Sequence, residues 1–187
     1  MQLNNAVKKR RSVKVYKDKK PDWRDIIECI DNVRYTPMAG NVFSLKFVLV
    51  DNSEKIKKIA DACQQDFISK AYYVVVFCSV PDYTTSLYDE RGKKYLKQQA
   101  GAGIQNFLLS IVDKGLSSCW VGHFNDKLIK EILSIPESVD VEAICPIGYE
   151  TSVRWKKENK AKSDLNSCLF FNGYGEKKMK KPKKLEV

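Results

Sequence analysis

Residues 8–24 hold the strongest chemical signal in the chain, a serine among basic side chains. They read KKRRSVKVYKDKKPDWR, with nine Lys or Arg residues against two acidic ones. Guanidinium and ammonium groups beside a hydroxyl suit a phosphate, because charge-assisted hydrogen bonds to an anion are strong and directional. A nucleic-acid arm and a solvated surface are the two other interpretations of such a segment.

The net charge of +10 is concentrated in three segments. Residues 8–24 contribute +7, residues 154–162 contribute +4 and residues 176–187 contribute +4, which leaves −5 for all other positions. A general nucleic-acid binder more often carries its basic residues on the body of the domain. The charge distribution therefore disfavours nucleic acid as the partner.

The other candidates for chemistry are six cysteines and one histidine, His123. The cysteines form no Cys-x-x-Cys pair, so we expect no metal site. Most of them lie in apolar runs such as VVVFCSV and EAICPIGY, and buried free thiols of this kind are typical of a reducing compartment. A single histidine is more often structural than catalytic, and a substrate contact is the alternative for His123.

Helices and strands that could position these side chains alternate along the chain. The apolar spacing predicts helices at residues 23–33 with Asp22 as N-cap, after Ser53, at residues 100–116 with Gly115 at the C′ position, and at residues 126–135 with Asn125 as N-cap. Strands are predicted at residues 44–51, 71–80, 117–124 and 141–150. Residues 82–95 show no clear period and are predicted to be a surface excursion over a site.

This alternation predicts a layered α/β or α+β sandwich. No Gly-x-Gly-x-x-Gly follows a strand and no Walker loop is present, so the common nucleotide-binding motifs are not the basis of any function. We expect one domain over residues 1–175 and a disordered Lys-rich tail over 176–187. No run approaches the ~18 apolar residues of a membrane helix. The default expectation is a soluble cytoplasmic protein.

Four separated motifs resemble, in order and spacing, those of the FMN-dependent nitroreductase family. They are RRSVKVY, TPMAGNVFSLKFVLV, GAGIQNFLLSIVDKGLSSCWVGHF and ICPIGYE, spread over about 140 residues. The resemblance implies an α+β fold, a three-layer α/β sandwich with a mostly antiparallel central sheet flanked by helices. It also implies a homodimer with FMN at the subunit interface and NADH or NADPH as the reductant.

By this resemblance, two basic segments converge on the FMN phosphate. The residues implied in phosphate and ribityl binding are Arg10, Arg11, Ser12 and Lys14, together with a C-terminal pair, Lys160 and Lys162. Lys14 stands where many relatives have Arg, which replaces a planar fork with a point charge. The alternative is that these side chains form only a solvated face.

Asn41 is the implied contact of the flavin pyrimidine edge, because an amide both donates and accepts hydrogen bonds. An Asn that serves only turn geometry beside Gly40 is the alternative. The preceding loop of the partner subunit implicates Pro37 and Met38. The chain departs from the family pattern just afterwards, where Phe43-Ser44-Leu45 replaces Gln-Pro-Trp.

Gly122 and His123 lie in the implied contact region of the flavin ring. Gly122 permits close approach, and a peptide N–H there would stabilise charge on the reduced cofactor. Trp120 and Cys119 are expected in the core. Since the cofactor carries the hydride chemistry, no catalytic side chain is required.

The leading hypothesis is therefore an oxidoreductase that passes hydride from a reduced nicotinamide through FMN to a small-molecule acceptor such as a nitro compound or quinone, by ping-pong kinetics. A flavin-binding carrier or sensor with little turnover is the second hypothesis. A basic nucleic-acid-binding protein is the third.

Overall fold

The computed structural model describes residues 2–151 and 164–178, which belong to two compact units, Met1–Thr151 and Ser152–Val187. Lys160 and Lys162 lie outside the described residues, as does the tail from residue 179 onward. In the described part of the second unit, residues 164–178, the structure has one short helix, α6 (Leu165–Cys168). The boundary at residue 175 and the disordered tail stay predictions.

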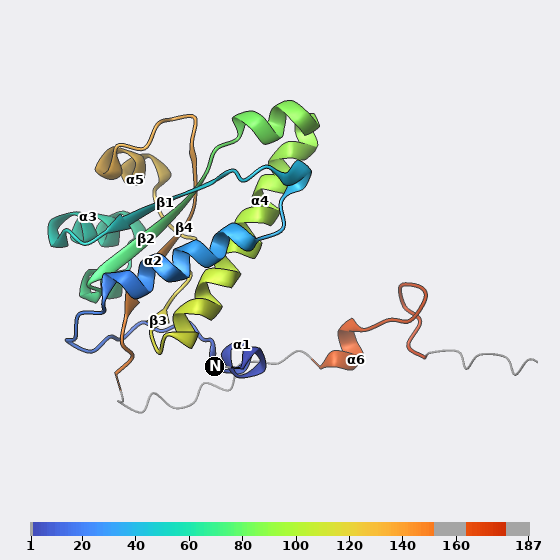
Figure 1. The fold of residues 1–187 in the computed structure, drawn as a ribbon, viewed down its shortest axis with the longest axis horizontal. Helices are drawn as coiled ribbons and strands as arrows, with labels where there is room; N and C mark the ends of the chain where they lie inside the picture. The colour runs from blue at the N-terminus through green and yellow to red at the C-terminus, as the bar shows by residue number, and fades with distance from the viewer. Residues whose placement is uncertain (1, 152–163, 179–187) are drawn as a thin grey trace, which may run out of the picture. The chain divides into compact units, whose positions relative to one another are not determined.

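A four-stranded antiparallel sheet forms the centre of the first unit (Figure 1). Its strand order is β1-β2-β4-β3, with β1 at Leu45–Val50, β2 at Tyr73–Ser79, β4 at Asp140–Gly148 and β3 at Ser117–Ser118. The two central strands are those with the longest apolar runs, since neighbours cover both of their edges and helices cover both faces. β3 is shorter than the predicted strand over 117–124, but the chain pairs once more where Val121 bridges to Ile144.

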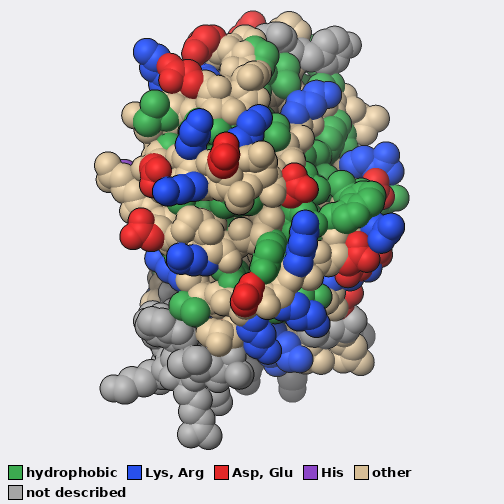
Figure 2. Space-filling view, turned by 90° about the vertical axis from the view of Figure 1, so that its left-hand side faces the viewer, with side chains coloured by type: hydrophobic (Ala, Val, Ile, Leu, Met, Phe, Trp, Pro, Cys, Tyr) green, Lys and Arg blue, Asp and Glu red, His purple; other side chains and the backbone are tan. Residues whose placement is uncertain are grey.

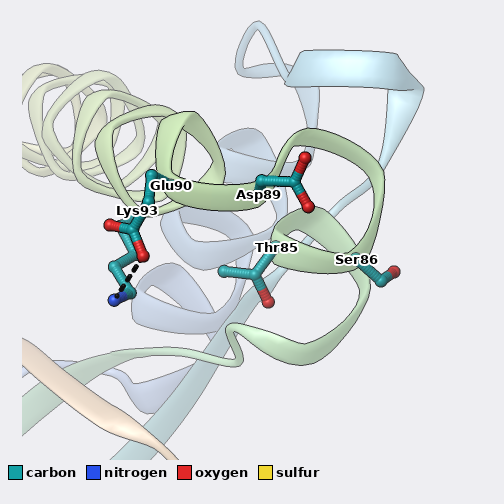
Figure 3. Close-up of a pocket in the computed structure, with 5 residues that line it drawn as sticks. All are labelled: Thr85, Ser86, Asp89, Glu90 and Lys93. Atoms are coloured by element: carbon teal, nitrogen blue, oxygen red, sulfur yellow. Dashed lines mark hydrogen bonds and ion pairs between the residues drawn. The ribbon is translucent and has the colours of Figure 1, made fainter.

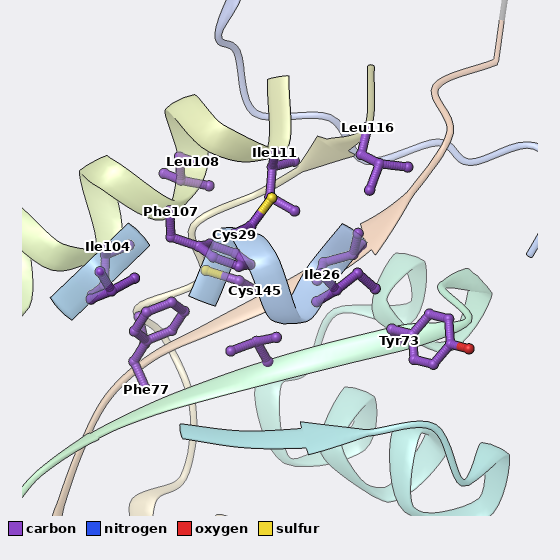
Figure 4. Close-up of a cluster of buried hydrophobic side chains, with 14 of the residues drawn as sticks. Ile26, Cys29, Tyr73, Phe77, Ile104, Phe107, Leu108, Ile111, Leu116 and Cys145 are labelled. Carbon is purple, nitrogen blue, oxygen red and sulfur yellow. The ribbon is translucent and has the colours of Figure 1, made fainter. Parts of the chain in front are cut away.

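Alternate residues of β2 divide the core into two layers. Val75 and Phe77 face a cluster that includes Ile26 from α2 (Trp23–Asp31) and Phe107 from α4 (Asp82–Asp113), shown in Figure 4. Val74, Val76 and Cys78 face the opposite cluster, which contains side chains of α3 (Ser53–Cys63), α5 (Asp126–Leu133) and η3 (Asp66–Lys70). The sheet therefore lies between two helical layers, and the predicted α+β three-layer sandwich is confirmed.

Helix boundaries follow local capping chemistry. Asp22 accepts a hydrogen bond from the Arg24 N–H and Asn125 accepts one from the Leu128 N–H, as predicted for N-caps. Asn52, rather than Ser53, caps α3. Gly115 follows α4 with a φ of +72°, which suits the predicted C′ position. A first helix, α1 (Leu3–Lys9), was not predicted, because it is short and buries only Ala6.

The main departure from prediction concerns residues 82–95, which are helical rather than an irregular excursion. They form the beginning of α4, interrupted at Asp89, whose φ and ψ are 48° and −133°. The chain reverses there, and Gly92 makes the return possible. A Cβ at Gly92 would lie 2.7 Å from the Thr84 carbonyl oxygen and 2.7 Å from the Thr85 Cα. The period is hidden because the reversal divides one helical pattern into two short ones.

Short 3-10 turns η1 (Asn32–Tyr35) and η2 (Ala39–Asn41) connect α2 to β1. Within the described ranges, none of the helices combines the length and apolarity needed to cross a membrane.

Candidate functional site

The basic segment of residues 10–16 lies beside β3 in an extended conformation. The Val13 N–H donates to the Ser118 carbonyl oxygen at 3.0 Å, and Ser12 forms a parallel bridge with Ser118. Val13 is buried, and Ser12 and Lys14 on either side of it are exposed, as expected where alternate side chains point to opposite sides. The pairing with β3 thus holds the basic segment on the sheet with its polar side chains outward.

Arg10, Ser12 and Lys14 gather around one thiol. Burial raises the pKa of Cys119, and the Ser12 hydroxyl and the positive charges of Lys14 and Arg10 act against that rise. Lys14 forms no ion pair with any described residue, and its Nζ lies 5.4 Å from the centre of the Phe67 ring. The "basic group" of Arg10, Ser12 and Lys14 therefore offers positive charge and a hydroxyl on one side of Cys119, a donor set suited to an anion.

Arg11 does not join the basic group. Its guanidinium pairs with Glu150, which is the last residue of the predicted strand 141–150 and lies two residues after the end of β4, and both side chains are substantially exposed. Such a pair contributes little to stability. The carboxylate of Glu150 offsets the positive charge of Arg11.

Gly122 and His123 follow the bridge of Val121 to Ile144 and are both exposed. A Cβ at Gly122 would meet only the Trp120 indole nitrogen, at 4.0 Å, so the space over this peptide is open. His123 makes no side-chain hydrogen bond or ion pair to a described residue. Cys119 is buried as expected, but Trp120 is 40% exposed and is not a core residue. Its ring lies beside the open space over Gly122.

A second group of predicted residues lies at the start of β1. Pro37 and Met38 line a hollow of about 360 Å³, together with side chains of α4 that include Tyr95 and Gln98. Asn41 is exposed, and its φ of +57° follows a φ of +59° at Gly40. We call residues 37–44 the Asn41 loop.

Buried polar side chains hold the Asn41 loop, and their role was not predicted from the sequence. The Gln99 amide donates to the Val42 carbonyl oxygen at 3.0 Å and accepts from the Ser44 N–H at 3.0 Å. The Ser44 and Thr84 hydroxyls are 2.7 Å apart. Nothing in the sequence near Gln99 distinguishes it from its neighbour Gln98, because the signal is the contact across 55 residues of chain.

A larger hollow, of about 470 Å³, lies at the reversal of α4 (Figure 3). Thr85, Ser86, Asp89, Glu90 and Lys93 line it, and Glu90 pairs with Lys93 at 3.4 Å. Its charged side chains are exposed. Nothing about these exposed side chains indicates catalysis.

The register of the sheet separates the two groups of predicted residues. Leu45, next to the Asn41 loop, pairs with Ser79 at one end of β2. Ser118, next to the basic group, pairs with Ile147, which pairs with Tyr73 at the other end of β2. Six residue steps at about 3.3 Å each give roughly 20 Å along the sheet. In Figure 1, η2 lies near the reversed start of α4 and β3 lies near its end.

Comparison with known proteins gives a consistent result. The Nitroreductase family profile matches residues 7–77 and 62–149. A protein of Archaeoglobus fulgidus assigned as an NADH dehydrogenase/NAD(P)H nitroreductase is 29% identical over 145 residues, which cover 75% of this chain and 80% of that protein. The iodotyrosine deiodinase of Thermotoga neapolitana is 21% identical over 165 residues, which cover 79% of this chain and 88% of that protein.

Solved structures share the fold. A nitroreductase family protein from Clostridium difficile superposes with a TM-score of 0.80 at 24% identity, covering 92% of this chain and 99% of that one. An iodotyrosine deiodinase bound to FMN and 3-iodo-L-tyrosine superposes with a TM-score of 0.72 at 18% identity, covering 81% and 91%.

Proposed function

This chain belongs to the nitroreductase family, and from that membership we propose that it is an FMN-dependent oxidoreductase. It takes electrons from NADH or NADPH and gives them to a small-molecule acceptor such as a nitro compound or quinone. The observation that carries the proposal is the basic group: two cations and a hydroxyl on one paired segment, with Lys14 free of carboxylate partners among the described residues.

The residues present fit FMN. Arg10, Ser12 and Lys14 would hold its phosphate, because a doubly charged anion takes charge-assisted hydrogen bonds from such donors. The open space over Gly122 would admit the flavin ring close to the backbone. Arg11 would contribute less than its neighbours while it stays paired with Glu150. Lys160 and Lys162 stay in the proposal as a second source of positive charge.

When bound, FMN would supply the hydride-transfer chemistry, and the protein would bind, orient and exclude water. Asn41 would donate to and accept from the pyrimidine edge. A backbone N–H near Gly122 would stabilise negative charge on the reduced ring. His123 would contact cofactor or substrate without transferring a proton. Donor and acceptor would use the same face in turn, which gives ping-pong kinetics.

A homodimer is part of the same proposal. The Asn41 loop and the basic group lie at opposite ends of one sheet, so a second copy would bring Pro37, Met38 and Asn41 of one chain to the basic group of the other. Several large apolar side chains are exposed in the single chain, among them Leu3, Val7, Trp23, Ile27 and Tyr35. On the face in Figure 2, hydrophobic side chains lie among interspersed acidic and basic ones.

A cytoplasmic location is also proposed, since five of the six cysteines are buried free thiols, a state typical of a reducing compartment. The interspersed charges in Figure 2 offer no continuous basic surface on that face for nucleic acid.

An absorbance spectrum of the purified protein after addition of FMN tests the cofactor. A bound flavin spectrum that bleaches when reduced nicotinamide is added without oxygen is the expected result. Multiple turnovers with a quinone, with parallel double-reciprocal lines, would support the enzyme. Bound flavin without turnover would favour a carrier or sensor. Absence of flavin binding would refute the proposal.

Sedimentation tests the dimer separately. A dimer with one FMN per chain is expected. A monomer with full flavin occupancy would remove Pro37 and Met38 from the site.

A further inference from the structure

We propose that Gln99 is the positioning residue of the Asn41 loop, and that its buried amide fixes the backbone from which Asn41 is presented. We call the two hydrogen bonds from Gln99 to the loop the clamp. Its effect on FMN binding rests on the proposed function, whereas the clamp itself does not. Gln99 lies on α4 and Asn41 lies before β1, so the clamp ties the loop to the longest helix of the fold.

The backbone of the Asn41 loop needs support from outside. Gly40 and Asn41 both have left-handed φ angles, +59° and +57°. Glycine adopts this conformation freely, but Asn does so at a cost that the surrounding structure must offset. Within the turn, the Val42 N–H donates to the Ala39 carbonyl oxygen at 3.1 Å.

Gln99 supplies that support to the two peptide groups after Asn41. Its amide nitrogen donates to the Val42 carbonyl oxygen and its amide oxygen accepts from the Ser44 N–H, each at 3.0 Å. The opposite polarity of these two partners fixes the orientation of the amide. Gln99 is only 5% exposed, so water cannot replace either bond without opening the structure.

Ser44 is the residue that makes this clamp possible. Its N–H bonds to Gln99, its carbonyl oxygen accepts from the Val80 N–H at 2.8 Å, and its hydroxyl bonds to Thr84. The family pattern has proline at this position, and proline has no N–H to donate. A proline here could therefore not make the hydrogen bond from Ser44 to Gln99.

Tyr88 closes the loop from the other side. Its hydroxyl oxygen lies 2.9 Å from the position a Cβ would take on Gly40, and its ring packs edge-on against Tyr95 at 5.2 Å. The Asn41 loop is thus held at Gly40 by an aromatic ring and at Val42 and Ser44 by Gln99. Asn41 itself, between these points, stays exposed.

Amide exchange of the full chain without added flavin tests the clamp directly. In Gln99→Met, which keeps the length of the side chain but removes both hydrogen bonds, the protection factor of the Ser44 N–H should fall at least tenfold. The Val76 N–H, in the centre of β2, should keep its protection. Gln105→Met, on an exposed position of the same helix, is the matched control and should change neither amide. Unchanged protection at Ser44 would overturn the proposal.

Gln99→Glu keeps the test decisive if the Met variant does not fold. A carboxylate accepts from the Ser44 N–H but repels the Val42 carbonyl oxygen, whereas the protonated acid can donate to it. The protection factor of Ser44, relative to the parent at the same pH, should therefore rise as the pH is lowered. A ratio that does not depend on pH contradicts the clamp.

A double-mutant cycle tests whether Gln99 acts through Asn41. FMN affinity should fall by about fivefold in Gln99→Met and in Asn41→Ala, and the double variant should bind within about twofold of Asn41→Ala, because the position of the loop no longer affects FMN once the Asn41 side chain is gone. Additive losses would show that Gln99 does not act through Asn41 and would overturn that part. If the parent protein binds no FMN, the proposed function fails while the exchange result still decides the clamp.

Discussion

The basic group and the Asn41 loop are built from different interactions. In the basic group Ser12 and Lys14 are exposed and Arg10 is partly buried, and the neighbouring Arg11–Glu150 pair is 54% and 30% exposed. The Asn41 loop is held by neutral groups that are almost fully buried: Gln99 and Ser44 are 5% exposed and Thr84 is 3% exposed. Exposed charges attract an anion over a distance, and salt screens this attraction. Buried neutral hydrogen bonds fix the orientation of the groups they join and depend little on salt. The basic group is therefore suited to capturing an anion, and we call it the capture region. The Asn41 loop is suited to orienting the bound molecule.

Both regions rest on one sheet, and Phe107 lies in the core cluster on one of its faces, so a large loss of packing there should disrupt both regions. Phe107 is fully buried and packs edge-on against Phe77, with ring centres 5.1 Å apart. Phe107→Ala should destabilise the protein by about 3–5 kcal/mol through lost burial and a cavity. Urea unfolding measures this, and loop and basic group should be lost in one transition. Two separate transitions would show that the regions are energetically independent.

Alkaline pH should weaken the core cluster on the opposite face of the sheet, which contains Cys78. Burial raises the pKa of Cys78 to about 11, with a further rise from Glu142. The thiol stays protonated in the folded chain while it ionises in the unfolded chain, so stability should fall between about pH 9 and 11. The slope is at most about 1.4 kcal/mol per pH unit per thiol.

Urea unfolding from pH 8 to 11 measures this slope. Burial also raises the pKa values of Cys29 and Cys63, each to about 12, so both thiols should add to the loss of stability at alkaline pH. Cys78→Ala should remove the contribution of one thiol from this slope, even though the variant is less stable than the parent at every pH. An identical slope in that variant would contradict the assignment.

Removal of Arg10 should break the capture region alone. Arg10→Ala removes a charge-assisted contact of about 1.5–3 kcal/mol, so FMN affinity should fall by about tenfold or more. The loss should shrink as salt rises, because the parent contact is screened. Titration at low and high salt measures both. Excess FMN should restore the melting temperature in part. Parent-like affinity would remove the basic group from the site.

Removal of the Asn41 side chain should give a smaller loss of FMN affinity than removal of Arg10, and this loss should not depend on salt. A neutral hydrogen bond contributes about 0.5–1.5 kcal/mol, so Asn41→Ala should weaken FMN binding by roughly twofold to tenfold. This loss should be the same at low and high salt. A salt-dependent loss would mean that the contrast between capture and orientation is not the right description.

The smallest effect is expected at His123, which belongs to neither region. His123→Ala should leave the rate of flavin bleaching by reduced nicotinamide within about tenfold of the parent in stopped-flow absorbance. A loss of ~10²–10⁴-fold, the scale of a general acid or base, would make His123 catalytic.

The family motifs placed the polar candidates along the chain but not in relation to one another. The resemblance put Arg10 and Arg11 together, whereas the structure turns them apart: Arg10 acts on Cys119, and Arg11 pairs with Glu150, 139 residues away. The site assignments remain predictions, and Lys160 and Lys162 lie outside the described residues.

The sequence by itself determined most of the helices and strands, because helix caps and the burial pattern of a strand depend on neighbours a few residues away. Asp22, Asn125 and Gly115 mark helix ends by local hydrogen bonds and backbone geometry, and the apolar run of β2 predicts a central strand. Only the tertiary structure decided the reversal at Asp89, the clamp of Gln99 on the Asn41 loop and the separation of that loop from the basic group. A periodic pattern states which face of an element is buried, but a hydrogen bond across 55 or 139 residues depends on which elements meet there.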